Sequence, residues 1–447
     1  MSDDLVIIVP GITGSVLARE GKPLWSLSAA ALRGGLVRTT EVLNALTLPS
    51  VLDCVSDYDQ HALETPELIR GLHVWPGFWK GSGYGQLIER VNTEAPGRVL
   101  CFPYDWRLPN AHSATRLQRF VDEALKDGQG QRVTFVCHSM GGLIARYYLE
   151  VLGGREHAAR LITIGTPFSG SVKAVKALTG GLVPHLPGID ERLVRVAKTF
   201  PSVAELLPTY RCVDVGDGGE PVFLDEIDVP GLAKDLVQRG RSFHDELREA
   251  VIRNNRAAGG REPTYALHVY AGKMQVTDQS IAIDKDRIVY RCTQRGVDHH
   301  GDGTVARFGA MPPEWTHDEN ARFRAAKHGP LAKHSDLLDD VIDQINSRDL
   351  GSILAPPDEL SLEVPDVASA SEPISVTVTS TSPNLRLHAS VRDADDTVYD
   401  GHIPVRPDTS GRRYETSLQL PAGLWQVRVE EITQHPSAFI EDLITVA

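Results

Sequence analysis

Cysteine is scarce in this sequence, and its spacing is as informative as its number. The 447 residues include five cysteines, Cys54, Cys101, Cys137, Cys212 and Cys292, and no two of them form a CxxC pair. The chain therefore lacks the pattern of a zinc ribbon and the cysteine density of a small disulfide scaffold. Because the number is odd, we expect reduced thiols in a cytoplasmic protein, with no bound metal.

Long apolar runs and an excess of positive charge are also missing. No stretch approaches the roughly 18 consecutive apolar residues that span a bilayer. The first residues, Met1–Val9, carry acids where a secretory signal carries cations, so we expect no signal peptide. Lys and Arg number 46 against 59 Asp and Glu, a formal net charge of −13. This balance argues against a nucleic-acid partner, because that affinity depends on clustered cations.

Short apolar, β-branched runs alternate with helical patterns through residues 1–350. This alternation is typical of an α/β fold, with a mainly parallel sheet that helices cover on both faces. One helix is expected over residues 141–152, between two strands. The predicted strands are Leu5–Val9, Arg98–Phe102, Val133–Cys137, Leu161–Ile164, Ala266–Ala271 and Arg322–Ala326.

Two insertions, near residues 21–85 and 169–260, interrupt this pattern. Insertions of that size in a compact fold are more often lids or substrate-binding caps than idle loops.

The character of the chain changes after residue 350. Ala355-Pro356-Pro357 indicates a linker over residues 351–358. From 359 to 447, period-two runs such as Ser375–Thr379 alternate with turn residues, which predicts an Ig-like β-sandwich accessory domain. Residues 351–447 contain six arginines, no lysine and fifteen acids. We interpret this acidic domain as a module that could bind a protein partner.

A candidate nucleophile stands where a predicted strand ends and a helix begins. The segment there reads Phe135-Val136-Cys137-His138-Ser139-Met140-Gly141-Gly142. A serine on such a turn has an exposed hydroxyl, and small neighbours let the strand and helix approach closely. Ser139 could instead merely cap the helix, but the pattern favours a nucleophile. Cys137 replaces the first glycine of the usual Gly-x-Ser-x-Gly motif and is interpreted as a buried strand residue.

A catalytic acid is expected between the serine and the histidine of such a chain. Asp302 lies between two glycines in Gly301-Asp302-Gly303-Thr304-Val305, a sharp turn from which a carboxylate can reach an imidazole. A plain Asp-Gly turn is the alternative, and a calcium loop fits poorly because the EF-hand spacing is missing. Asp298 is the alternative acid.

Two histidines compete for the role of base. His328 follows the predicted strand Arg322–Ala326 at the sheet edge where active sites of such folds lie. His334 precedes a helix that we expect to begin with Ser335 as its N-cap. We favour His328 and keep His334 as the alternative base.

An oxyanion needs two N–H donors. Met140, directly after the nucleophile, should supply one of them from the start of the helix. The glycine-rich loop Pro10-Gly11-Ile12-Thr13-Gly14 should supply the other, through Ile12. The loop could instead be a plain turn, while GxGxxG and GxxxxGK[ST] phosphate motifs are absent.

These segments together resemble the lecithin:cholesterol acyltransferase-like lipase family over about residues 5–347. The similar motifs are Val9-Pro10-Gly11-Ile12-Thr13-Gly14-Ser15, Phe102-Pro103-Tyr104-Asp105-Trp106-Arg107, Ile164-Gly165-Thr166-Pro167-Phe168-Ser169-Gly170 and Gly301-Asp302-Gly303-Thr304-Val305. His328, with the apolar Leu331 three positions later, matches the pattern around the family's catalytic histidine. The β domain lies outside the resemblance.

The resemblance implies Ser-dependent acyl-ester chemistry on a lipid, either hydrolysis or transfer to an alcohol. We expect no cofactor, and the sequence leaves open whether the protein makes transient contact with a membrane surface. It also implies a lid over an acyl groove. The first insertion could supply that lid through apolar side chains that could equally fill a core, namely Trp25, Leu46, Leu48, Trp75 and Trp79. Secreted relatives carry a signal peptide and a disulfide near the lid, and neither is evident in this sequence.

The predicted function is that of a serine lipase, phospholipase, esterase or O-acyltransferase. Ser139 would attack the ester, His328 would move the proton, and Asp302 would orient the imidazole. Two other readings stay open: an interaction protein recruited through its β-sandwich, and an esterase or thioesterase that acts on non-lipid substrates.

Overall fold

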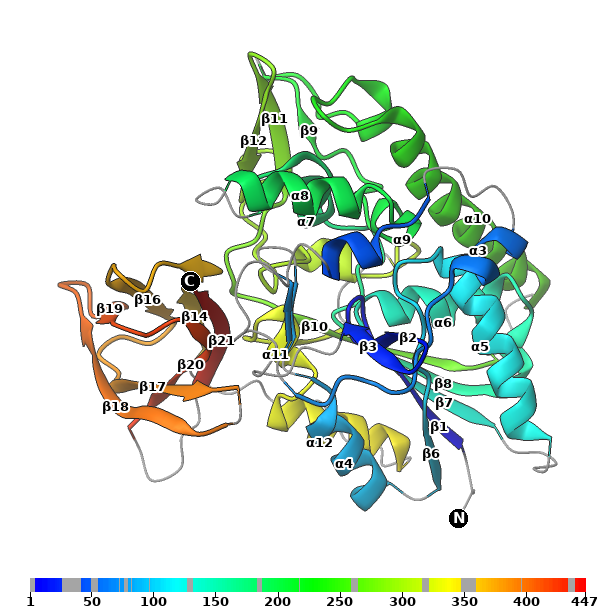
Figure 1. The fold of residues 1–447 in the computed structure, drawn as a ribbon, viewed down its shortest axis with the longest axis horizontal. Helices are drawn as coiled ribbons and strands as arrows, with labels where there is room; N and C mark the ends of the chain where they lie inside the picture. Colours follow the sequence, from blue (N-terminus) through cyan, green and yellow to red (C-terminus); the bar gives the residue numbers. More distant parts are fainter. Residues whose placement is uncertain are drawn as a thin grey trace.

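The computed structural model places an α/β domain beside a C-terminal β domain (Figure 1). Its description covers the chain apart from residues 1–4, 26–41, 50–54, 72, 76–78, 82, 96, 127–131, 183–186, 217, 259–263, 316–320, 347–358, 395 and 433–438.

A six-stranded sheet forms the centre of the α/β domain. Its order is β13-β10-β8-β7-β1-β6, and every neighbouring pair is parallel. The strands are β1 (Leu5–Val9), β6 (Arg98–Cys101), β7 (Val133–His138), β8 (Ala158–Ile164), β10 (Ala266–Gly272) and β13 (Ala321–Arg324). All six predicted strands are present, and the predicted α/β fold is confirmed.

Helices cover both faces of this sheet. The sequence of β1 explains why both layers of helices are needed. Leu5, Ile7 and Val9 belong to one apolar core, shared with α5 and α6. Val6 and Ile8 point the other way, into a second core shared with α4 and α12. These helices are α4 (Gly85–Glu94), α5 (Asn110–Leu125), α6 (Met140–Glu150) and α12 (Ser335–Ile345). Because a strand turns alternate side chains to opposite faces, a strand that is apolar at every position needs both covers.

The second insertion forms a cap above the sheet, at the top of Figure 1. Its helices are α7 (Val172–Thr179), α8 (Pro187–Ala197), α9 (Pro201–Ala204) and α10 (Lys234–Ala258). A three-stranded sheet joins them, made of β9 (Val213–Asp214), β11 (Ser280–Asp284) and β12 (Arg287–Arg291). The cap therefore includes a hairpin beyond the predicted limit of residue 260.

The first insertion is held against the main core where the structure describes it. Its elements are β2 (Leu17–Arg19), β3 (Lys22–Trp25), α3 (Val55–His61), β4 (His73–Trp75) and β5 (Trp79–Gly81). Trp25, Leu46 and Leu48 are buried in the main core, so they fill the core as the alternative interpretation held. The side chains of Trp75 and Trp79 lie outside the described residues.

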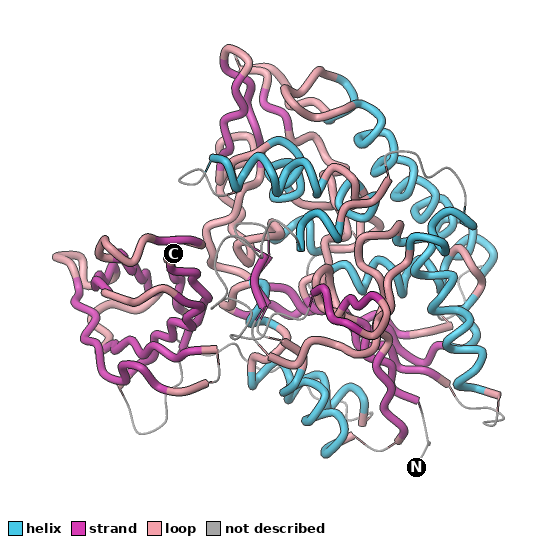
Figure 2. Tube along the Cα trace, viewed as in Figure 1, coloured by secondary structure: helices cyan, strands magenta, loops and turns pink. Residues whose placement is uncertain are grey.

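The C-terminal domain curls around an apolar core (Figure 2), and its described residues form an eight-stranded sheet. Its strand order is β14-β16-β19-β18-β17-β20-β21-β15. The strands are β14 (Leu360–Glu363), β15 (Val367–Ala368), β16 (Ile374–Ser380), β17 (Leu387–Asp393), β18 (Val398–Pro407), β19 (Arg413–Leu418), β20 (Gly423–Glu431) and β21 (Phe439–Val446). The prediction of a separate β domain is confirmed. Within its sheet, β18 pairs with both β17 and β19. The predicted linker, 351–358, lies outside the described residues.

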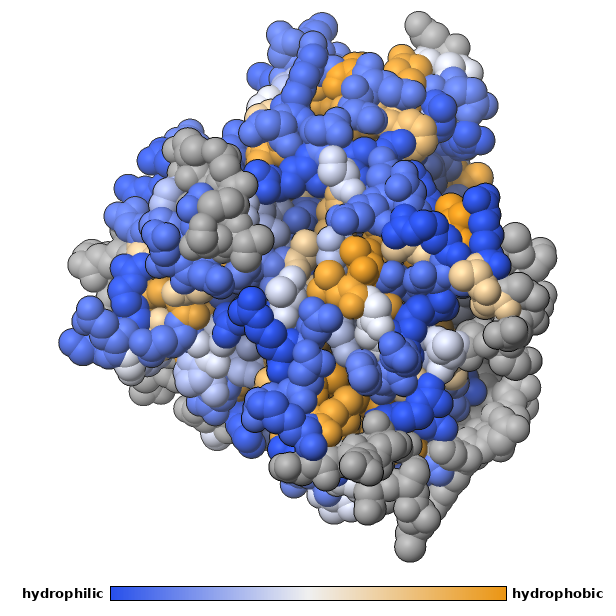
Figure 3. Space-filling model, turned by 90° about the vertical axis from the view of Figure 1, so that its right-hand side faces the viewer, coloured by the Kyte–Doolittle hydropathy of each residue, from blue (hydrophilic) through white to orange (hydrophobic). Residues whose placement is uncertain are grey.

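The surface in Figure 3 is largely hydrophilic, with apolar areas scattered across it. Scattered apolar side chains are normal on a folded surface. Among the described residues, no helix is long and apolar enough to cross a membrane.

A buried carboxyl group lies where the cap meets α5. Glu205 is 4% exposed, and its Oε2 accepts a hydrogen bond of 2.7 Å from the Asn110 N–H. Burial raises the pKa of Glu205 from 4.5 to about 8, although the Asn110 N–H and the charge of Arg239 oppose the shift. His244 donates a hydrogen bond to the Glu205 carbonyl, and burial lowers the pKa of His244 to about 4. The histidine therefore stays neutral while Glu205 titrates.

We expect Glu205→Gln to stabilise the protein increasingly as the pH rises from 4.5 to 8. The folded state holds the Glu205 proton more tightly than the unfolded state, so the wild type loses stability through this window, whereas Gln stays neutral. The difference should grow by at most roughly 1.4 kcal/mol per pH unit. Urea denaturation at several pH values measures it. For the control Glu220→Gln, at an exposed site, the free energy of unfolding should change with pH as in the wild type. The same result for Glu205→Gln would contradict the raised pKa of Glu205.

Candidate active site

Ser139 lies on a sharp turn between β7 and α6. Its backbone has φ 53° and ψ −125°, a left-handed conformation that costs energy for any residue other than glycine. Two hydrogen bonds hold the turn: Ser139 N–H donates to the Ile164 carbonyl at 2.8 Å, and the Thr166 hydroxyl donates to the Ser139 carbonyl at 2.9 Å. A serine held in this way has the geometry of a nucleophile elbow.

The small residues around Ser139 are required by close contacts. A Cβ on Gly141 would lie 2.5 Å from the Pro10 carbonyl oxygen, and one on Gly142 would lie 2.1 Å from the Thr166 hydroxyl. Cys137, at the position of the usual first glycine, is completely buried. Burial raises the pKa of its thiol well above the ordinary value. It is therefore held as a neutral core side chain, as predicted from its place in the strand.

His328 lies between Ser139 and Asp302. Its Nε2 is 2.9 Å from Ser139 Oγ, and its Nδ1 is 2.6 Å from Asp302 Oδ2. An ionised carboxylate can only accept, so Nδ1 carries the proton and Nε2 is left to accept from the serine hydroxyl. The three side chains come from different parts of the chain, and their residues are only 1% to 4% exposed.

The turn that carries Asp302 fixes its carboxylate. Asp302 Oδ1 accepts hydrogen bonds from the N–H groups of Thr304 and Val305, at 2.9 and 2.7 Å. Its carbonyl accepts from the N–H of His328 at 2.9 Å. The turn packs tightly against β10, because a Cβ on Gly272 would lie 2.4 Å from the Asp302 Cβ. Backbone contacts thus hold the acid and the base together, independently of their side-chain bond.

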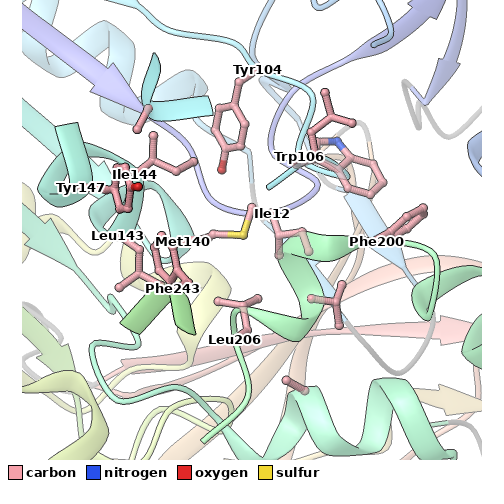
Figure 4. Packing of buried hydrophobic residues seen from close by; sticks show 14 of the residues in the cluster. Ile12, Tyr104, Trp106, Met140, Leu143, Ile144, Tyr147, Phe200, Leu206 and Phe243 are labelled. Carbon is pink, nitrogen blue, oxygen red and sulfur yellow. The ribbon is translucent and has the colours of Figure 1, made fainter. Parts of the chain in front are cut away.

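The loop after β1 lies beside the serine, as a candidate oxyanion site requires. A Cβ on Gly11 would be 2.9 Å from the Cβ of Ser139. Thr13 has φ 62°, which turns the loop back on itself. Ile12 and Met140 lie close together in Figure 4, and both are completely buried. The two residues expected to donate to an oxyanion are therefore brought to the same place.

Tyr84 and His138 were not predicted as site residues, yet their hydrogen bonds connect the loop after β1 with His328. The Gly11 N–H donates to the Tyr84 hydroxyl at 2.8 Å, and that hydroxyl is 2.8 Å from His138 Nδ1. His138 Nε2 is 3.1 Å from the carbonyl of His328. A carbonyl only accepts, so Nε2 donates and Nδ1 accepts from the tyrosine. His138 thus connects the base to the oxyanion loop.

The alternative acid and base lie elsewhere. Asp298 Oδ1 accepts hydrogen bonds from Gln279 and from the His300 backbone. It lines a separate cavity of about 560 Å³. His334 stacks on Phe439 of the β domain, with ring centroids 5.0 Å apart. It is the N-cap of α12, which begins at Ser335, so the predicted cap is displaced by one residue.

A cavity of about 20 Å³ touches Ser139. Four apolar residues line it, Pro167, Ala174, Leu206 and Val305, together with Ser171, Lys173 and Thr304. Leu206, Ile12 and Met140 face one another in Figure 4. Among the described residues, no group of three or more His, Cys, Asp or Glu side chains could hold a metal ion.

The parallel sheet with helices on both faces, and the serine on its turn after a central strand, define an α/β-hydrolase fold. Residues 86–245 match the family model described as Lecithin:cholesterol acyltransferase. That stretch includes Ser139 but neither Asp302 nor His328.

Two curated proteins are similar to parts of the chain. Phospholipid–sterol O-acyltransferase of Arabidopsis thaliana is 29% identical over 127 residues, which are 25% of this chain and 20% of that protein. Phosphatidylcholine-sterol acyltransferase of Gallus gallus is 32% identical over 88 residues, which are 19% and 21% of the two chains. The chain thus spans about a fifth of the length of these relatives. With the family match, they confirm the predicted resemblance to the lecithin:cholesterol acyltransferase-like lipase and acyltransferase family.

Solved structures with some likeness include a lipase of Bacillus licheniformis in its mature form. It is 13% identical, with a TM-score of 0.36, over 77% of this chain and 92% of that one. A phospholipase of Legionella pneumophila is 10% identical, with a TM-score of 0.33, over 84% and 89% of the two chains.

Proposed function

We propose that this protein is a serine-dependent acyl hydrolase or acyltransferase that acts on lipid esters. The observation that carries the proposal is the hydrogen-bonded series Ser139–His328–Asp302. The apolar residues around the serine and the resemblance to sterol acyltransferases support a lipid substrate. We include transient contact with a lipid surface, since such substrates aggregate in water. The four described cysteines form no disulfide, which supports a cytoplasmic location.

The reaction would begin with attack of the Ser139 oxygen on the ester carbonyl carbon, while His328 Nε2 takes the hydroxyl proton. Asp302 would stabilise the imidazolium that forms and hold its Nδ1–H in place. The N–H groups of Ile12 and Met140 would donate to the tetrahedral oxyanion. His328 would then protonate the leaving alcohol as the acyl-enzyme forms. Water or a second alcohol would release the acyl group by the reverse steps.

Incubation with mixed phospholipid vesicles and a free long-chain alcohol tests this proposal. Mass spectrometry should detect lysophospholipid with free fatty acid if water is the acceptor, and also an acyl ester of the added alcohol if transfer occurs. A matched series of p-nitrophenyl esters should show a preference for long acyl chains. Preference for short chains would favour an esterase for non-lipid substrates.

Labelling by a fluorophosphonate separates an enzyme from an inert interaction protein. We expect the probe to react with Ser139, since it needs only an activated serine and not the natural substrate. Peptide mapping would locate the label. Absence of labelling together with absence of ester turnover would overturn the proposed function.

A further inference from the structure

The acidic β domain contacts the α/β domain beside the candidate catalytic turns. Three lysines of the α/β domain face three acids of the β domain across this boundary. The pairs are Lys273 with Glu359 at 2.6 Å, Lys333 with Glu441 at 2.7 Å, and Lys327 with Asp442 at 3.7 Å. All six side chains are less than a quarter exposed. Charges withdrawn from water in this way interact more strongly than surface pairs do.

One side chain links the β domain to the turn of the acid. Gln275 is completely buried; its Nε2 donates to the Leu360 carbonyl at 3.1 Å and its Oε1 accepts from the Leu362 N–H at 3.2 Å. The Gln275 side-chain amide thus donates one hydrogen bond to β14 and accepts one from it, as the backbone of a neighbouring strand would. Its own backbone exchanges two hydrogen bonds with Gly301, at 2.9 and 3.2 Å. Gly301 directly precedes Asp302.

Two further contacts continue this link through the acid turn. The Thr277 hydroxyl donates to the Gln275 carbonyl at 2.8 Å and accepts from the Gly303 N–H at 2.9 Å. The side chain of Lys327 passes over the same glycine, because a Cβ on Gly303 would lie 3.3 Å from Lys327 Cδ. The turn is therefore held on both sides of Asp302.

The short helix of the base is held from the β domain as well. α11 (His328–Leu331) packs against β21. Lys327 immediately precedes this helix and Lys333 follows it, and both bind neighbouring acids of β21. A small cavity of about 10 Å³ lies along this contact, lined by Pro330 and His334 on one side and by Phe439 and Ile440 on the other.

We propose that the C-terminal β domain is a structural part of the catalytic site, with Gln275 and the Lys333–Glu441 pair as positioning residues for Asp302 and His328. This inference rests on the proposed function. Catalytic groups must be held to within about 0.5 Å of the productive geometry, and short turns at a sheet edge need outside support for that. The β domain supplies it to the acid through β14 and to the base through β21.

Charge reversal at one pair tests the proposal in the full-length protein. Lys333→Glu and Glu441→Lys should each lower kcat for a soluble p-nitrophenyl ester by about 10-fold to 100-fold, as small misplacements of catalytic groups do. KM should change little, because neither residue lines the cavity at Ser139. The double variant Lys333→Glu with Glu441→Lys restores the attraction between these two residues and should recover part of kcat, because the contacts of Glu441 with Gln426 and Arg428 stay lost.

Lys234 and Asp228 provide a matched control. They are also 2.7 Å apart, but both side chains are 83% exposed. Reversal of either charge should leave kcat unchanged. If the single variants at residues 333 and 441 also keep the wild-type kcat, or the double variant is no better than the singles, the proposal is overturned.

Gln275→Met supplies a second test, because it keeps the size of the side chain and removes both hydrogen bonds to β14. It should lower kcat, slow fluorophosphonate labelling, and weaken the strongly downfield proton NMR signal expected for His328 Nδ1–H against a carboxylate. An unchanged signal and labelling rate would contradict a positioning role. If the wild-type protein shows this NMR signal but neither ester turnover nor labelling, only the proposed function is overturned.

Discussion

Replacement of Ser139 by alanine is expected to reduce kcat for ester hydrolysis by about 10⁴- to 10⁶-fold. The oxygen that would form the acyl-enzyme is then missing, and His328 Nε2 loses its partner at 2.9 Å. The remaining rate would come from the oxyanion donors and from substrate binding, which survive the change. A p-nitrophenyl ester assay measures the loss, and fluorophosphonate labelling should disappear with it.

The fold should tolerate this substitution. Ser139 is bound to its neighbours through its backbone N–H and carbonyl, and both groups remain in alanine. The strained φ of 53° also remains, so we expect a melting temperature close to that of the wild type. Ser242→Ala, on the outside of α10, is the matched control and should keep full activity. Undiminished turnover by Ser139→Ala would rule out this serine as nucleophile.

Much of the fold could be predicted because the amino-acid composition of the central strands indicates that they are buried. Leu5–Val9 is apolar at each position, and the structure buries all five residues between two layers of helices. The cap was harder to delimit. Its hairpin β11–β12 lies after residue 260, and exposed positions alternate with half-buried ones in β12, as in many edge strands. Nothing local in that pattern assigns the hairpin to the cap rather than to the central sheet.

The residues of the candidate site that belong to a short sequence motif could be predicted. Asp302 lies between two glycines, and Ser139 has the small residues Cys137 and Gly141 two positions away on either side; this local signal predicted both. The sequence left His328 and His334 in competition, because they are only six positions apart and both lie near helix starts. Packing distinguishes them: α11 presents His328 to the serine, and Phe439 covers His334.

Contacts between distant segments could not be predicted from the sequence. Tyr84 meets Gly11 and His138 across 73 and 54 residues, and Gln275 meets Leu360 across 85. Neither Tyr84 nor Gln275 belongs to a recognisable pattern, since a tyrosine or a glutamine is common in any helix or loop. They act only through the positions that the completed fold gives them.

The Tyr-Asp-Trp-Arg segment contains a buried ion pair whose loss should have the largest effect on stability. Asp105 and Arg107 are each 1% exposed, and their side chains form two hydrogen bonds, of 2.9 and 2.6 Å. Arg107 also donates to the carbonyls of Leu46 and His61, while Asp105 accepts from the Leu63 N–H. The pair therefore ties two stretches of the first insertion to the core.

Asp105→Ala should lower the free energy of unfolding by about 3–5 kcal/mol, because it leaves the Arg107 charge buried without its partner. Urea denaturation measures the loss, and limited proteolysis should cut first near residues 46–63, which lose their anchor. The exposed pair Arg413–Glu415 supplies the control. Glu415→Ala should change stability by less than about 1 kcal/mol. If Asp105→Ala cost no more than this control, the burial of the Arg107 charge would not depend on Asp105, and the hydrogen bonds from Arg107 to Leu46 and His61 would suffice, with the apolar contacts, to anchor the first insertion.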